Sequence, residues 1–134
     1  MLDEVLTTEE RAVVARAKAF AQEHVAPNAA RWEWERRYPL ETIKAACAAG
    51  LNTIELAKKH GGQGLSFSCK LRAFEEIARH DFAFAFALIN HHNAVARFAR
   101  DGKPAQPSTD GWISCCVGGG TVPLRLSAPD SALA

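Results

Sequence analysis

The helical spacing of the apolar residues is the feature that most constrains how this chain can fold. In residues 7–24, one face carries the apolar residues Val13, Ala17, Phe20 and Ala21. That spacing is typical of an amphipathic helix. Thr7 and Glu10 stand three residues apart just before this pattern, where they can form a capping box. We therefore predict a helix from Thr7 to about His24 with one buried face.

Further helix signals follow along the chain. Pro39 suits the first turn of a helix that ends before Gly50. Ser66 can cap a helix with an apolar stripe made of Leu71, Phe74, Ile77 and Ala78. The segment "NAARWEWERR" favours a short helical piece in which Trp32 and Trp34 pack, and "LNTIELAKK" is expected to be irregular.

The stretch "FAFAFALI", residues 82–89, admits two interpretations. Phenylalanines at alternate positions are typical of a strand. Alanine, however, is a strong helix former and a poor strand former. Leu88, Val95 and Phe98 continue at helical spacing, so we predict a helix capped by Asp81 that runs to about Arg100. Its apolarity on nearly all sides indicates contact with more than one neighbour.

From about Lys103 the composition changes to proline, serine and glycine without helical spacing. The chain is therefore expected to be all-α over residues 1–106, followed by an irregular tail over residues 107–134.

Composition and charge exclude several classes of protein. Sixteen basic and fifteen acidic residues in 134 leave a net charge of +1, which does not suit a nucleic-acid binder. The longest apolar run is too short for a membrane span, and the first residues lack the features of a secretory signal. Cys47, Cys69, Cys115 and Cys116 form no disulfide or metal spacing, so we expect a reducing cytoplasm.

The ordered series "LTTEERAVVARAKAFAQEHVAPNAARWEWERRYP", "AAGL", "HGGQGLS" and "FEEIARHD" resembles the N-terminal helical domain of acyl-CoA dehydrogenases over residues 6–106. The resemblance implies that a full-length homo-oligomer acts in fatty acid metabolism on an acyl-CoA substrate, using FAD and passing electrons to an electron-transferring flavoprotein. In that family, a carboxylate from a C-terminal bundle removes the α-proton, and a β-domain supplies most flavin contacts. We therefore expect a truncated chain that is inactive alone and retains no FAD.

The tail "LRLSAPDSALA" partly matches the family motif that approaches the flavin. Leu126 and Ser127 match it and are weak candidates for cofactor binding, while Ala128 replaces the motif's glutamate. "PSTDGWISCCVGGGTV" resembles nothing in the family. These differences suggest a truncated or frame-disrupted gene, which reading the DNA in all three frames would test.

By the same resemblance, Phe82, Ala85, Phe86 and Ile89 form a wall of the acyl pocket, which the bulky phenylalanines would shorten or divert. The alternative is that they are core or subunit-interface residues. His91 and His92 are adjacent, so their side chains diverge and no metal site is expected. Glu75 and Arg79 suit a solvent-facing ion pair. Arg36, Arg37, Lys58 and Lys59 could attract the phosphates of coenzyme A, although a solvated basic surface explains them as well.

The glycines of "KHGGQGLS" match neither dinucleotide-binding nor P-loop spacing, so we interpret them as a turn. The leading hypothesis is a fragment of a FAD-dependent acyl-CoA dehydrogenase. The alternatives are part of a related flavin-dependent monooxygenase and a non-catalytic helical interaction module.

Overall fold

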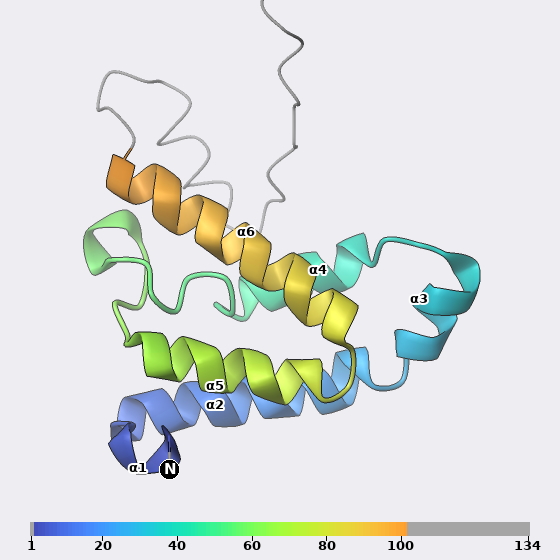
Figure 1. Ribbon diagram of the computed structural model, residues 1–134, viewed down its shortest axis with the longest axis horizontal. Coiled ribbons are helices and arrows are strands. Elements are labelled where there is room, and N and C mark those ends of the chain that lie inside the picture. The colour runs from blue at the N-terminus through green and yellow to red at the C-terminus, as the bar shows by residue number, and fades with distance from the viewer. Residues whose placement is uncertain (1, 102–134) are drawn as a thin grey trace, which may run out of the picture.

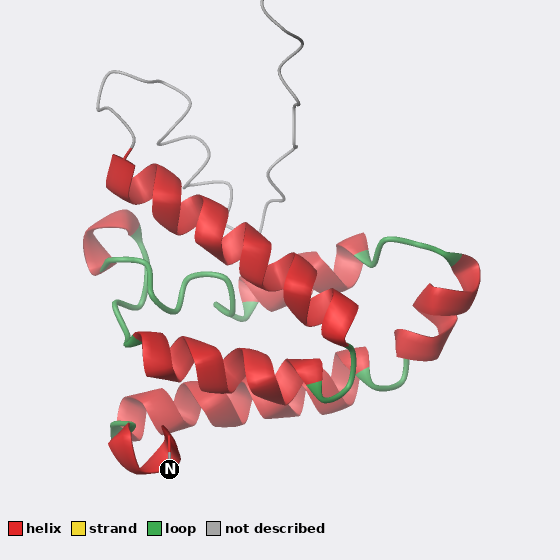
Figure 2. Ribbon diagram, in the orientation of Figure 1, coloured by secondary structure: helices red, strands yellow, loops and turns green. Residues whose placement is uncertain are grey.

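The computed structural model describes residues 2–101, which form a set of packed helices (Figure 1). The helices are α1 (Leu2–Val5), α2 (Thr8–Phe20), α3 (Ala29–Glu35), α4 (Leu40–Ala48), α5 (Phe67–Ala78) and α6 (Phe82–Asp101), with a π-helical turn at Ala21–Val25 and a 3-10 turn at Lys58–His60. Within this range there is no strand (Figure 2). The all-α prediction is confirmed, and residues 107–134 lie outside the described part.

Helix α5 packs between α2 and α6 (Figure 1). The core lies between these helices and the 51–57 segment, and its largest fully buried apolar side chains are Ile43, Leu51, Ile54, Ile77, Phe84 and Leu88. The predicted helix for residues 7–24 is confirmed, but its last turn widens. There the Ala26 N–H donates to the Ala21 carbonyl at 2.8 Å, five residues back, which is the π-helical pattern.

Glu10 joins the start of α2 to the start of α5. Its carboxylate accepts the Thr7 N–H at 2.9 Å, completing the predicted capping box, and the Ser66 N–H at 2.9 Å. The Ser66 hydroxyl in turn accepts the Cys69 N–H, so Ser66 caps α5 as predicted. Hydrogen bonds from Ser66 and then Thr7 lower the pKa of Glu10 to about 2.

The predicted apolar stripe of α5 is wrong at Leu71, which is 41% exposed. The helix touches both α2 and α6, and its buried arc therefore includes Lys70 and Ala73 instead. The packing predicted for Trp32 is confirmed, because its ring stacks on Phe84 with centroids 5.5 Å apart. The same prediction is wrong for Trp34, which is 88% exposed at the edge of α3.

The 51–57 segment is irregular, as predicted, yet most of it is buried. The glycine-rich turn folds back on it: the Gly62 N–H donates to the Ala57 carbonyl and the Gly64 N–H to the Leu56 carbonyl, at 3.2 and 2.8 Å. A Cβ at Gly62 would lie 2.0 Å from the Leu56 oxygen, so only glycine fits this close approach.

Candidate functional site

The first two turns of α6 carry the four residues predicted to form an acyl-pocket wall. Phe82 and Phe86 are 73% and 55% exposed, and their rings stack with centroids 6.0 Å apart. Ala85 is buried on the core side of the helix, and Ile89 is half-buried against the core. The structure thus brings Phe82 and Phe86 together on the outer face, with Ile89 at its border and Ala85 beneath it.

The buried side of α6 fixes which way these residues face. Asp81 caps the helix, as predicted, by accepting the Phe84 N–H at 2.9 Å. The Phe84 ring lies between those of Trp32 and Phe20, with the Phe20 centroid 6.4 Å away. With Phe84 and Leu88 locked in the core, the helical phase turns Phe82 and Phe86 outward.

A polar cluster under the other half of α6 was not predicted. The Lys70 ammonium, whose side chain is 8% exposed, pairs with the Glu55 carboxylate and also reaches Asn93 Oδ1 at 3.5 Å. Lys70 also lies over the Phe67 ring, 4.8 Å from its centroid. The sequence did hold one signal for the burial of Lys70. It stands at helical spacing between Phe67 and Phe74, on an otherwise apolar face.

His92 belongs to the same cluster and is 1% exposed. Its Nε2 accepts the Glu55 N–H at 3.2 Å. Burial, and then the nearby Lys70 charge, lower the pKa of His92 to about 4, so it is neutral near pH 7. Among the described residues, no three His, Cys, Asp or Glu side chains gather where they could hold a metal ion. His92 therefore serves as a buried hydrogen-bond acceptor for the backbone N–H of Glu55.

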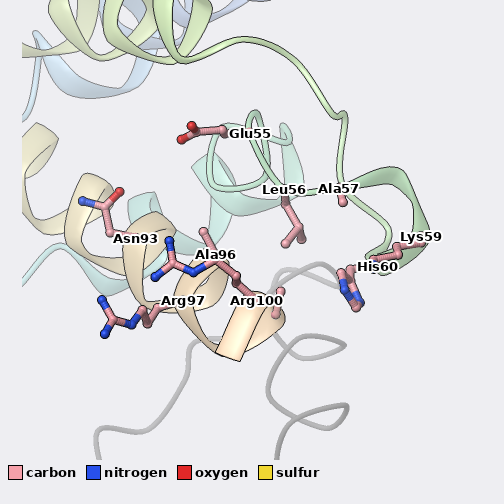
Figure 3. Close-up of a pocket in the computed structure, with 10 residues that line it drawn as sticks. Glu55, Leu56, Ala57, Lys59, His60, Asn93, Ala96, Arg97 and Arg100 are labelled. Carbon is pink, nitrogen blue, oxygen red and sulfur yellow. The ribbon is translucent and has the colours of Figure 1, made fainter. Parts of the chain in front are cut away.

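A cleft of about 530 Å³ opens beside this cluster, between the 55–60 segment and the C-terminal half of α6 (Figure 3). Its polar lining consists of Glu55, Lys59, His60, Asn93, Arg97 and Arg100. Arg97 and Arg100 both pair with Asp101, at 2.5 and 2.9 Å. Of the four basic residues considered from the sequence, Lys59 is the one that lines this cleft.

The predicted ion pair between Glu75 and Arg79 is confirmed at 3.3 Å. Arg72 joins it by also bonding Glu75 and Glu76. The network lies along α5, and hydrogen bonds from Arg72 and then Arg79 lower the pKa of Glu75. Glu75 and Arg79 face solvent, whereas the side chains of Arg72 and Glu76 are largely buried, so we interpret the network as structural.

The glycine-rich turn is the described segment that most resembles a flavin phosphate cradle. A cradle needs free backbone N–H groups directed at the ligand. Here the N–H groups of Gly61, Gly62, Gln63, Gly64 and Leu65 all donate to backbone carbonyls of residues 53–58. The turn therefore does not fit a flavin phosphate, in agreement with its interpretation as a turn. Leu126 and Ser127, the candidates for cofactor contact, lie outside the described residues.

Comparison with known proteins now adds to this geometry. The model of the family described as "Acyl-CoA dehydrogenase, N-terminal domain" matches residues 7–109. The chain belongs to the acyl-CoA dehydrogenase family. Because the match runs from the cap of α2 past the end of α6, helices α2 to α6 correspond to this family's N-terminal domain.

Several known proteins, two acyl-CoA dehydrogenases and a desulfinase among them, are similar to this chain. A probable acyl-CoA dehydrogenase, fadE25, of Mycobacterium leprae is 34% identical over 57% of this chain and 20% of its own length. The short/branched chain specific acyl-CoA dehydrogenase of Bos taurus is 33% identical over 61% of this chain and 19% of its own. The 3-sulfinopropanoyl-CoA desulfinase of Variovorax paradoxus is 30% identical over 75% of this chain and 26% of its own length.

The chain spans about a fifth of the length of the first two relatives. The family match over residues 7–109 is to the N-terminal domain, so it is this domain of the acyl-CoA dehydrogenase family that the chain is shown to contain. Within residues 2–101, no helix is both long and apolar enough to cross a membrane.

Proposed function

We propose that residues 1–106 are the helical domain of a FAD-dependent acyl-CoA dehydrogenase and that residues 107–134 are a degenerate start of its β-domain. Such an enzyme dehydrogenates an acyl-CoA thioester between its α and β carbons, and bound FAD supplies the hydride acceptor. The observation that carries this proposal is the family match over residues 7–109. Membership in the family supports an acyl-CoA substrate. The names of the relatives above all refer to an acyl-CoA thioester.

Within that function, we assign Phe82, Ala85, Phe86 and Ile89 to a wall of the acyl pocket. The stacked Phe82 and Phe86 rings support this role because they leave an aromatic surface open to an apolar partner. An acyl chain lying against them would exclude water, and their bulk would limit the length of the chain that fits. The wall would hold the substrate, while the groups that react come from elsewhere.

The 134-residue chain alone is proposed to be inactive and to bind FAD too weakly to retain it. This rests on the N–H groups of the glycine-rich turn, which are all occupied by backbone carbonyls. Weak cofactor contacts are assigned to Leu126 and Ser127. In its full-length form, a cytoplasmic homo-oligomer that passes electrons to an electron-transferring flavoprotein is proposed from the family.

A second candidate is an acyl-CoA reaction other than dehydrogenation. The similarity to 3-sulfinopropanoyl-CoA desulfinase, which covers 75% of this chain, favours it. Because the helical domain is shared with dehydrogenases, it supports acyl-CoA binding more strongly than it supports one reaction.

The first experiment measures flavin and turnover in the purified chain. We expect no visible flavin absorbance after the chain is incubated with FAD and free FAD is removed by desalting, and no reduction of a dye acceptor with acyl-CoA. Stoichiometric bound FAD would contradict the proposal that the chain cannot retain it. A chain without flavin that instead co-purifies with a stable protein partner and ignores acyl-CoA would favour an interaction module.

The second experiment tests the wall directly through the aromatic NMR signals of Phe82 and Phe86. We expect acyl-CoA to shift these signals and free coenzyme A to leave them unchanged. Trp34, which is 88% exposed and lies on α3, provides the internal control. Equal shifts at Trp34, or equal shifts with free coenzyme A, would argue against an acyl wall.

A further inference from the structure

The cleft beside the Lys70 cluster has a lining that is unusually rich in cationic donors. Figure 3 shows these side chains on two sides, with Lys59 and His60 on the 55–60 segment and Arg97 and Arg100 on α6. Its volume of about 530 Å³ falls in the range of small-molecule sites. It opens along the second half of α6, whereas the proposed acyl wall occupies the first two turns.

The charges around the cleft do not cancel. Two carboxylates, of Glu55 and Asp101, face four cations, of Lys59, Lys70, Arg97 and Arg100. The Glu55 carboxylate is already paired with buried Lys70, and the Asp101 carboxylate is shared between two guanidinium groups. An excess of two positive charges remains at this place in a chain whose net charge is only +1.

The donors also suit one kind of ligand. Each guanidinium has five N–H donors in a planar fork, and one shared carboxylate cannot occupy all of them. The Arg97 and Arg100 side chains are 73% and 69% exposed, so the remaining donors are accessible to a ligand. Asn93 directs its Oδ1 toward Lys70, which leaves its amide NH₂ as a further donor. Arginine forks match the oxygens of phosphate and carboxylate groups. Leu56, Ala57, Ala96 and Ala99 add small apolar surface beside these donors.

We propose that this cleft binds a small organic dianion, either a phosphate monoester or a dicarboxylate. Arg97 and Arg100 bind the anionic group from α6, and Lys59 and His60 contact it from the 55–60 segment on the opposite side. Lys70, buried beside the cleft and paired with Glu55, holds Asn93 in place. This site goes beyond the proposed dehydrogenase role, and its test requires neither acyl-CoA nor FAD.

The test is an NMR titration of the 134-residue chain with inorganic phosphate, phenyl phosphate and glutarate, each at ionic strength held constant with chloride. We expect saturable shifts of the backbone amides of Lys59, His60 and residues 93–100. Tighter binding of phenyl phosphate than of glutarate would identify the ligand class as phosphate monoesters, and the reverse order as dicarboxylates.

The double variant Arg97→Gln/Arg100→Gln should weaken binding by roughly tenfold or more, because it removes charge-assisted hydrogen bonds. Arg11→Gln/Lys18→Gln removes the same charge from exposed positions of α2 and should leave binding unchanged. Lys59→Gln tests the opposite side, and circular dichroism checks that each variant folds. Shifts that do not saturate, no shifts at all, or equal weakening by both double variants would overturn the proposal.

Discussion

The two faces of α6 both carry phenylalanine, buried on one face and exposed on the other. Phe84 is 2% exposed between Trp32 and Phe20, whereas Phe82 and Phe86 are 73% and 55% exposed. The difference is helical phase alone, since these residues alternate along one short stretch. The comparison teaches that the buried face holds the fold together and that the outer face is free for a ligand or another part of the protein.

The largest expected effect comes from the buried face. Phe84→Ala should lower the free energy of unfolding by about 3–5 kcal/mol, because it removes a core aromatic ring and leaves a cavity. Urea unfolding followed by tryptophan fluorescence would measure it, with Phe98→Ala as the exposed control. A loss no larger than that of the control would show that Phe84 does not anchor α6.

Farther along the buried face, His92 should make stability depend on pH. Its pKa is near 6.5 when unfolded and about 4 when folded, so the unfolded chain binds the proton first. The free energy of unfolding should therefore fall as the pH drops from about 6.5 to 4, by up to about 3 kcal/mol. Lys70, Glu55 and His91 are the charged or titratable groups that influence it.

Urea unfolding curves at several pH values would measure how steeply the free energy of unfolding depends on pH, which is the slope of interest. His92→Gln should flatten it, because a glutamine amide can accept the Glu55 N–H without taking up a proton. An unchanged slope in His92→Gln would assign the pH dependence to other groups.

The Lys70–Glu55 pair should contribute less. Lys70→Met keeps much of the buried stem but removes the ammonium, and we expect a loss of about 1–2 kcal/mol. The effect is moderate because the Glu55 side chain is 35% exposed, so water can solvate the carboxylate left behind. Adding Glu55→Gln should then cost less than it does in the wild-type chain, and simple additivity of the two losses would contradict direct pairing.

The smallest effect belongs to the outer face. Phe82→Ala/Phe86→Ala should change the free energy of unfolding by less than about 1 kcal/mol, since exposed substitutions are usually close to neutral. The same urea protocol applies. A loss as large as that of Phe84→Ala would erase the distinction between the two faces.

The helices and their caps could be predicted from the sequence because the signals are local. Thr7, Glu10, Ser66 and Asp81 cap within three residues of their own position. The second partner of Glu10, the Ser66 N–H, lies 56 residues away, and no local pattern predicts it. The exposure of Leu71 could not be predicted either, since it depends on α5 touching both α2 and α6.

The candidate sites divide in the same way. Family resemblance and helical spacing single out Phe82, Ala85, Phe86 and Ile89, and their role as an acyl wall stays a prediction. The Lys70 cluster and the basic cleft depend on contacts between Glu55, Lys70 and Asn93, which are 15 or 23 residues apart. A lysine or arginine usually signals a solvated surface. The helical spacing of Lys70 with Phe67 and Phe74 indicates that it lies on an apolar face, but the sequence does not identify its partners.

The most direct test of the two-face account compares acyl-CoA with free coenzyme A in the wild-type chain and in Phe82→Ala/Phe86→Ala. The account predicts that the wild-type chain has the lower dissociation constant for acyl-CoA, and that the variant folds normally but loses this preference. A folded variant that keeps the full preference would contradict the assignment of the outer face to the acyl chain.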